Sequence, residues 1–89
     1  MSRAPSIGIP ELAGLGTYAE SIRTHEASVV PVQTDLPYDE LALIGCGVTT
    51  GVGAALNTAN VQPGDVVVVI GCGGVGQFVV QGARIAGAA

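Results

Sequence analysis

The chain has 89 residues, of which 48% are hydrophobic and 11% charged, so it is long enough for one small domain and has little charged surface. Its formal net charge is −4, which argues against nucleic acids and anionic membrane surfaces as partners, because both attract basic proteins. Its two cysteines, Cys46 and Cys72, form neither a C-x-x-C pair nor a disulfide framework of the secreted kind, and we expect a reduced, cytoplasmic protein.

The first part of the chain predicts loops and short edge strands. Residues 1–16 are rich in Gly, Pro and Ala and show no hydrophobic period. Residues 17–24 alternate as in a half-exposed strand, and residues 29–32 predict a second short strand in which Pro31 belongs at a sheet edge. His25 lies between the two, and because no second metal-ligating residue lies near it in the sequence, we interpret it as a surface or hydrogen-bonded residue.

Two helical segments follow, separated by a glycine-rich break. Pro37 suits the first turn of a helix, and the acidic Asp39 and Glu40 favour the positive end of its dipole. The glycines on either side of Cys46 then interrupt the pattern, and a second helix is predicted over residues 48–58.

Residues 41–64 carry no charge, which raises the question of a membrane span. Threonines and asparagines lie within the would-be hydrophobic core, so we expect no transmembrane helix. Gly47 and Gly51 form a G-x-x-x-G pair, which indicates helix dimerisation only within a truly apolar segment of about 20 residues.

Residues 61–65 predict a turn, because Pro63 and Gly64 stand at the two central positions, as is typical of type II. The turn leads into a strand, a glycine-rich turn and a helix. Residues 66–70, the valine run, are five consecutive β-branched residues, typical of a strand buried on both faces of a parallel sheet. Residues 71–76, the glycine turn, place Gly71, Gly73 and Gly76 in G-x-G-x-x-G spacing. Such glycines allow a tight turn, close approach of a pyrophosphate and packing of the following helix on the strand. The alternative is a glycine-rich turn in an ordinary βα unit.

Cys46 lies between two glycines, ahead of this strand–turn–helix pattern. A free cysteine commonly packs as a small hydrophobic residue, so the thiol on its own specifies no function. Its functional interpretation depends on the surrounding sequence.

Three motifs occur in a fixed order along the chain. They are Gly45-Cys46-Gly47-Val48-Thr49-Thr50-Gly51-Val52-Gly53-Ala54-Ala55, Pro63-Gly64-Asp65 and Gly71-Cys72-Gly73-Gly74-Val75-Gly76. In this order they resemble the zinc-containing medium-chain alcohol dehydrogenases. Within this family the motif residues most resemble the branch of glutathione- or mycothiol-dependent formaldehyde dehydrogenases and nicotinoprotein alcohol dehydrogenases. The resemblance extends from about Gly16 to the last residue.

The resemblance implies an α/β fragment with three parts. Residues 1–36 match the end of a GroES-like, β-rich catalytic domain, and residues 37–62 match linking helices that carry the zinc-ligand-type cysteine. Residues 63–89 match the start of a Rossmann dinucleotide-binding domain, of which the chain holds the first βα unit. The family commonly forms homo-oligomers, which the resemblance implies here too.

The resemblance also implies roles for individual residues. Cys46 matches a ligand of the catalytic zinc, Thr50 matches the threonine that contacts the nicotinamide, and Val75 matches the valine behind its ring. The residues that match the pyrophosphate turn are Gly71, Gly73, Gly74 and Gly76. The implied cofactors are zinc and NAD or NADP, and the implied activity is hydride transfer to or from a small alcohol, an aldehyde or a hydroxymethyl-thiol adduct of formaldehyde.

The chain carries only part of such a site. A catalytic zinc has three protein ligands, and this sequence offers one, because residues 1–15 contain neither Cys nor His. The acidic residue that would hold the ribose is expected about 20 residues after the glycine turn, past Ala89. We therefore expect the chain alone to be inactive and to bind zinc and nucleotide weakly.

Two other functions stay open on the sequence. One is a non-catalytic remnant or small interaction module that pairs its exposed strand with a partner. The other is a phosphate-binding βα fragment of an unrelated Rossmann protein, against which the order of Cys46 and the glycine turn argues.

Overall fold

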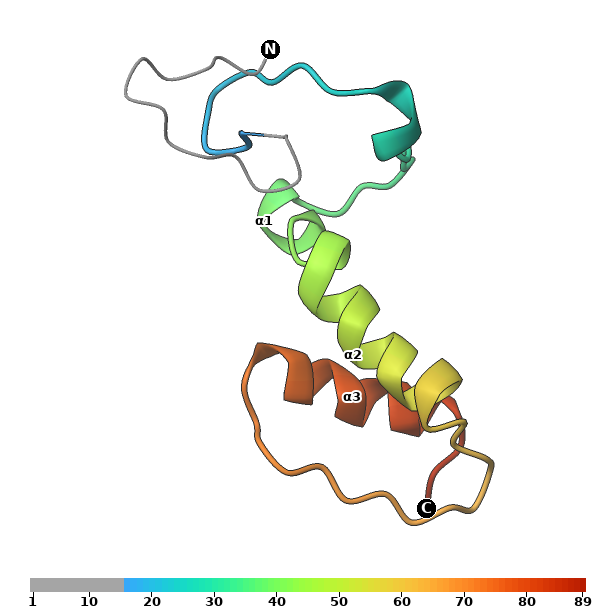
Figure 1. Ribbon diagram of the computed structural model, residues 1–89. Helices are drawn as coiled ribbons and strands as arrows, with labels where there is room; N and C mark the ends of the chain where they lie inside the picture. Colours follow the sequence, from blue (N-terminus) through green and yellow to red (C-terminus); the bar gives the residue numbers. More distant parts are fainter. Residues whose placement is uncertain (1–15) are drawn as a thin grey trace. The chain divides into compact units, whose positions relative to one another are not determined.

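The computed structural model describes residues 16–89 and divides the chain into two compact units, Met1–Thr34 and Asp35–Ala89 (Figure 1). The loop predicted over residues 1–15 lies outside the described residues. All regular elements of residues 16–89 are helical, and no strand occurs among them.

Residues 16–34 contain one short element, the 3-10 turn η2 (Glu26–Ser28). The ring nitrogen Nδ1 of His25 accepts a hydrogen bond from the backbone N–H of Ala27 at 3.0 Å, and this bond caps η2. The His25 side chain is exposed. The interpretation of His25 as a surface, hydrogen-bonded residue is therefore confirmed.

The strands predicted at residues 17–24 and 29–32 do not form. Large side chains in both stretches are exposed, among them Tyr18 and Val30. A strand is stable only when a neighbouring strand accepts its backbone hydrogen bonds, and residues 16–34 hold no such neighbour. In this chain the alternating pattern alone is therefore not enough to build a strand.

A nearly continuous helical run from Tyr38 to Thr58 begins the second unit (Figure 1). Pro37 precedes it at the N-cap position, in extended backbone geometry. The elements of the run are α1 (Tyr38–Leu41), the π-helical turn η3 (Ile44–Val48), α2 (Thr49–Gly53) and the π-helical turn η4 (Ala54–Thr58).

The predicted break around Cys46 is wrong, because the helix continues through this stretch as η3. The N–H of Val48 donates to the carbonyl oxygen of Leu43 at 3.1 Å, the five-residue spacing of a π-helix. The hydroxyl of Thr49 donates to the carbonyl oxygen of Ile44 at 2.5 Å and so satisfies a carbonyl in the widened turn. The two glycines that flank Cys46 lower the helix propensity of this stretch, but they do not end the helix.

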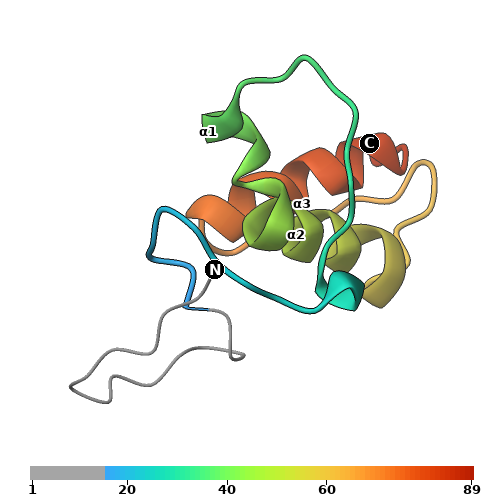
Figure 2. The same cartoon turned by 90° about the horizontal axis from the view of Figure 1, so that it is seen from above.

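The run Tyr38–Thr58 has 21 residues and is, by length and composition alone, apolar enough to cross a membrane. A single helix of this kind is weak evidence for a span, since mostly buried core helices pass the same test, although only 11% of the apolar window of this run is buried. In this chain one side of the run packs against another helix, α3 (Gly74–Ile85) (Figure 2).

The helix predicted after the glycine turn is confirmed as α3, which has 12 residues. Gly73 occupies its N-cap position, and no side chain caps it. Gly87, with φ of 91°, follows its end, as is common where a helix stops. Glycines therefore flank α3, with Gly73 at its N-cap and Gly87 two residues after Ile85.

The core of the second unit is small and lies between η4, α3 and the loop that joins them. Ala55, Val61 and Ala83 are buried there. The half-buried residues that pack against these three are Val67, Val79, Ala86 and Ala88. With such small side chains, the core depends on close approach of the backbones more than on the bulk of its residues.

The turn predicted ahead of the valine run is confirmed. Gly64 has φ of 86°, as the third residue of a type II turn requires, and the N–H of Asp65 donates to the carbonyl oxygen of Gln62 at 3.1 Å. Two further backbone bonds of 2.8 Å join this turn to the end of the chain, from Gly64 to Gly87 and from Ala89 to Asp65. They hold the start of the valine run beside the end of α3.

The valine run does not form the predicted hydrogen-bonded strand. Its side chains still alternate: Val67 and Val69 are half-buried on the side of α3, whereas the exposed fractions of Val66, Val68 and Ile70 are 83%, 82% and 98%. A parallel strand needs neighbours at its edges, and residues 16–89 supply none. The run therefore has one covered face and one bare face.

Candidate functional site

The glycine turn has the geometry for which its glycines are needed. Gly71 has φ of 105°, a conformation that residues with side chains rarely adopt. A Cβ atom on Gly76 would overlap the carbonyl oxygen of Gly71, so only glycine fits at that position. At Gly73 and Gly74, in contrast, an added Cβ would meet nothing within 4 Å. The turn is thus tightly packed at Gly76 and open at Gly73 and Gly74, which we call its open side.

The open side of the turn can receive an anion. The first N–H groups of α3 point out of its N-terminal end, where the helix dipole adds partial positive charge. Neither a capping side chain at Gly73 nor an acidic residue in the first turn of α3 competes for them. These residues fit a pyrophosphate group.

A side chain that the sequence reasoning missed ties the glycine turn to α3. The amide Nε2 of Gln77 donates to the sulfur of Cys72 at 2.9 Å and lies 3.5 Å from the carbonyl oxygen of Cys72. Both bonds are exposed and span five residues, a spacing for which no sequence motif is diagnostic. Gln77 therefore links the first turn of α3 back to the glycine turn.

Cys46 and Thr50, the two predicted site residues of the first helical run, lie four positions apart in η3 and α2. The side chains of both are exposed, and Cys46 is a free thiol. We call residues 46–50 the cysteine turn. Its two functional groups are accessible from outside the helix.

The packing of α2 on α3 brings the cysteine turn and the glycine turn together. Gly51 is buried, and a Cβ atom added to it would lie 2.6 Å from the carbonyl oxygen of Val75. One turn later Ala55 meets Gly82 in the same way, with the added Cβ at 3.0 Å. The two helices therefore run in the same chain direction along their contact, and η3 also contacts α3. The cysteine turn and the glycine turn lie at the same end of the packed pair (Figures 1 and 2).

The described residues do not form a complete zinc site. Within residues 16–89, no group of three or more His, Cys, Asp or Glu side chains is placed to hold a metal ion. A catalytic zinc has three protein ligands and one open position. The accessible thiol of Cys46 fits one of those ligands. A zinc held here would need two more ligands from outside the described residues.

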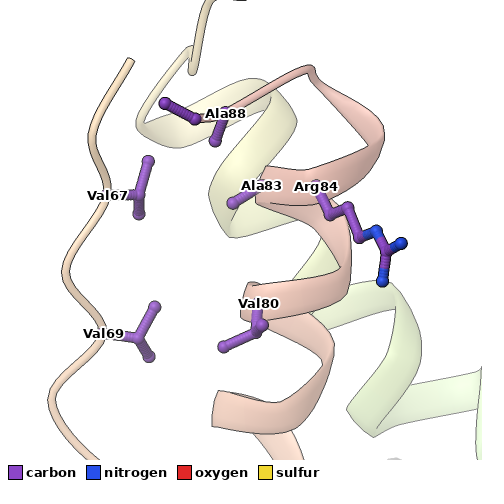
Figure 3. A pocket seen from close by; sticks show the side chains of 7 residues that line it. Val67, Val69, Val80, Ala83, Arg84 and Ala88 are labelled. Carbon is purple, nitrogen blue, oxygen red and sulfur yellow. The ribbon is translucent and has the colours of Figure 1, made fainter. Parts of the chain in front are cut away.

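A separate, open cleft of about 330 Å³ lies between the valine run and α3 (Figure 3). Val67 and Val69 point across it toward Val80 and Ala83 of α3, and Arg84 is the one charged residue of its lining. None of the predicted site residues lines it. The cleft is a gap between apolar side chains and carries none of the chemistry expected of the site.

The sequence is similar to curated dehydrogenases over most of its length. It is 53% identical over 75 residues to S-(hydroxymethyl)glutathione dehydrogenase of Saccharomyces cerevisiae and 49% identical over 74 residues to alcohol dehydrogenase B of Mycobacterium tuberculosis. It is 45% identical over 75 residues to alcohol dehydrogenase class-3 of Pisum sativum. These matches cover 83% to 84% of this chain but only 19% to 20% of the relatives, so the chain spans about a fifth of their length. No protein-family model matches the chain.

Proposed function

Because the chain is homologous to a segment of the medium-chain alcohol dehydrogenase family, we propose that it forms the cofactor-facing part of a zinc-dependent oxidoreductase. The proposed reaction is hydride transfer between NAD or NADP and an alcohol or the hydroxymethyl-thiol adduct of formaldehyde. The observation that carries the proposal is the contact between α2 and the start of α3, which puts the cysteine turn and the glycine turn at one end of two packed helices.

In this proposal the glycine turn binds the pyrophosphate of the dinucleotide. Gly71 and Gly76 make the turn tight, and the open space at Gly73 and Gly74 lets the phosphates approach the N–H groups of α3. Thr50 and Val75 then orient the nicotinamide ring. Their common neighbour supports this role, since Gly51, next to Thr50 in the sequence, touches the backbone of Val75.

Cys46 is proposed to bind zinc as a thiolate, together with two ligands from outside residues 16–89. Zinc, when bound, acts as a Lewis acid on the substrate oxygen. The contribution of this chain is to hold the thiolate at a fixed distance from the nicotinamide site, because helix η3 is packed on α3.

The rest of the proposal concerns the domains to which residues 1–36 and the valine run would belong. We propose that residues 1–36 end a GroES-like domain and that the valine run is the first strand of a Rossmann sheet. The bare face formed by Val66, Val68 and Ile70 supports this, because such a face is stable when further strands and helices cover it. It follows that the isolated chain shows no alcohol-dependent reduction of NAD.

A graft tests the proposal in a complete enzyme. Residues 16–89 would replace the matching segment of the yeast S-(hydroxymethyl)glutathione dehydrogenase, to which the chain is 53% identical over 75 residues. We expect the graft to reduce NAD and to hold the zinc content of its parent. Cys46→Ser in the graft should remove one zinc per subunit and lower the activity by more than about 100-fold. Cys72→Ser is the matched control and should keep all of the zinc.

Two results would contradict the proposal. One is a folded, active graft in which Cys46→Ser keeps the zinc content of Cys72→Ser. The other is alcohol-dependent reduction of NAD by the purified 89-residue chain, which would show that no further ligands or strands are needed.

The bare face of the valine run also favours a second candidate function, a small interaction module. Exposed β-branched residues on an unpaired stretch are a template for strand addition by a partner. The two candidates differ in one measurement, the affinity for NAD. If the chain is an interaction module, it gains strand content when a partner binds. The graft that carries its residues 16–89 then does not bind NAD.

A further inference from the structure

We propose that Gly51 is a positioning residue, which sets the distance between the cysteine turn and the glycine turn because it has no side chain. The proposal rests on the proposed function for the meaning of that distance. The geometry itself can be tested in the 89-residue chain without any activity.

The contacts of Gly51 leave no room for a methyl group. An added Cβ would lie 2.6 Å from the Cβ of Phe78, 2.6 Å from the carbonyl oxygen of Val75 and 2.8 Å from the backbone nitrogen of Val79. Two of these three atoms belong to the backbone of α3, so a change of side-chain rotamer cannot relieve the overlap. Ordinary van der Waals contact begins at 3.4 Å, so an alanine would push the two helices apart by about 1 Å.

The location of Gly51 makes this displacement relevant to the site. Gly51 directly follows Thr50 and lies about one helical turn after Cys46, while its partner Val75 lies inside the glycine turn. The interaxial distance of packed helices depends on the side chains at the contact. Gly51 therefore sets the distance between the two helices at a contact that lies beside both the cysteine turn and the glycine turn.

This role also explains the G-x-x-x-G pair of Gly47 and Gly51. The pair faces α3 of the same chain: Gly51 touches Val75, Phe78 and Val79, and a Cβ on Gly47 would lie 4.0 Å from the ring of Phe78. Only the second glycine of the pair is tightly packed. The motif thus serves a helix contact within the chain, which neither zinc binding nor pyrophosphate binding requires by itself.

Gly53 offers a matched control two positions away on the same helix. An added Cβ on Gly53 meets nothing within 4 Å. Gly51→Ala and Gly53→Ala make the same chemical change in α2, and both bring the same gain in helix propensity. Any difference between the two variants therefore reports the contact with α3.

The geometric test uses the two native cysteines. Cys46 and Cys72 are both exposed and free, and they lie on the two turns whose separation is in question. Nitroxide labels on both, in the 89-residue chain, give a distance distribution by pulsed electron paramagnetic resonance. We expect wild type and Gly53→Ala to share one narrow distribution, and Gly51→Ala to give a longer mean distance or a distribution about twice as wide. Equal distributions for the two alanine variants would overturn the proposal.

The functional test uses the graft, where the rest of the enzyme supports the fold if Gly51→Ala does not fold in the short chain. We expect Gly51→Ala to keep its zinc and to lower kcat by about 100-fold, as a misplacement of 1 Å can do, while Gly53→Ala keeps the kcat of the graft. An unchanged kcat in Gly51→Ala would contradict the positioning role. An inactive graft with a shifted label distance in Gly51→Ala would instead contradict the proposed function and leave the geometric inference standing.

Discussion

The helix crossing of α2 and α3 and the valine run are both apolar. The facing surfaces of the two helices are packed against each other, whereas one face of the valine run is bare. A helix satisfies its backbone hydrogen bonds internally, so two helices need only complementary surfaces, which Gly51 and Gly82 provide. A strand must find its hydrogen-bond partners elsewhere, and the valine run finds none among residues 16–89. The described residues therefore hold both partners of the helix crossing but only one strand-like partner of a sheet.

The largest effect is expected from crowding the crossing. A Cβ on Gly82 would lie 2.9 Å from the Cα of Val52 and 3.0 Å from the Cβ of Ala55, so Gly82→Val should lower the free energy of unfolding by about 2–3 kcal/mol. Urea unfolding followed by circular dichroism measures this change. The control is Gly53→Val, whose side chain has open space and should change the stability by less than about 0.5 kcal/mol. Equal losses in both variants would show that the crossing is not the contact that holds the unit together.

A smaller effect should distinguish the two faces of the valine run. Val67 is half-buried against the core, and Val68 is 82% exposed. Val67→Ala should therefore lower the free energy of unfolding by about 1 kcal/mol, whereas Val68→Ala should leave it unchanged within about 0.3 kcal/mol. The same urea experiment compares them. If both variants are equally stable, the alternation of the run is not a feature of the chain in solution.

Local sequence signals predicted the elements that are closed by local bonds. The helix after the glycine turn and the type II turn at Gly64 both occur, because each depends on hydrogen bonds between residues a few positions apart. The break expected around Cys46 is wrong for a related reason. The helix continues there as a π-turn, in which the Thr49 hydroxyl donates to the carbonyl oxygen of Ile44.

Signals that depend on distant partners were less informative. The valine run has the composition of a buried strand, but burial is decided by neighbours that composition cannot supply. The candidate site divides in the same way: its residues could be proposed from motifs, whereas the contact of Gly51 with Val75 could not. A G-x-x-x-G pair marks a helix face for close packing and does not name the helix that packs on it.

The most direct test of the account is whether the cysteine turn and the glycine turn are neighbours in solution. A nitroxide on Cys46, in a chain carrying Cys72→Ser, should strongly broaden the amide resonances of Gly74, Val75 and Gly76 in a nitrogen–proton correlation spectrum. The amide of Asp65, at the far end of the valine run, serves as the internal reference and should be broadened less. The account predicts this gradient. Equal broadening throughout residues 65–76, or none in the glycine turn, would contradict it.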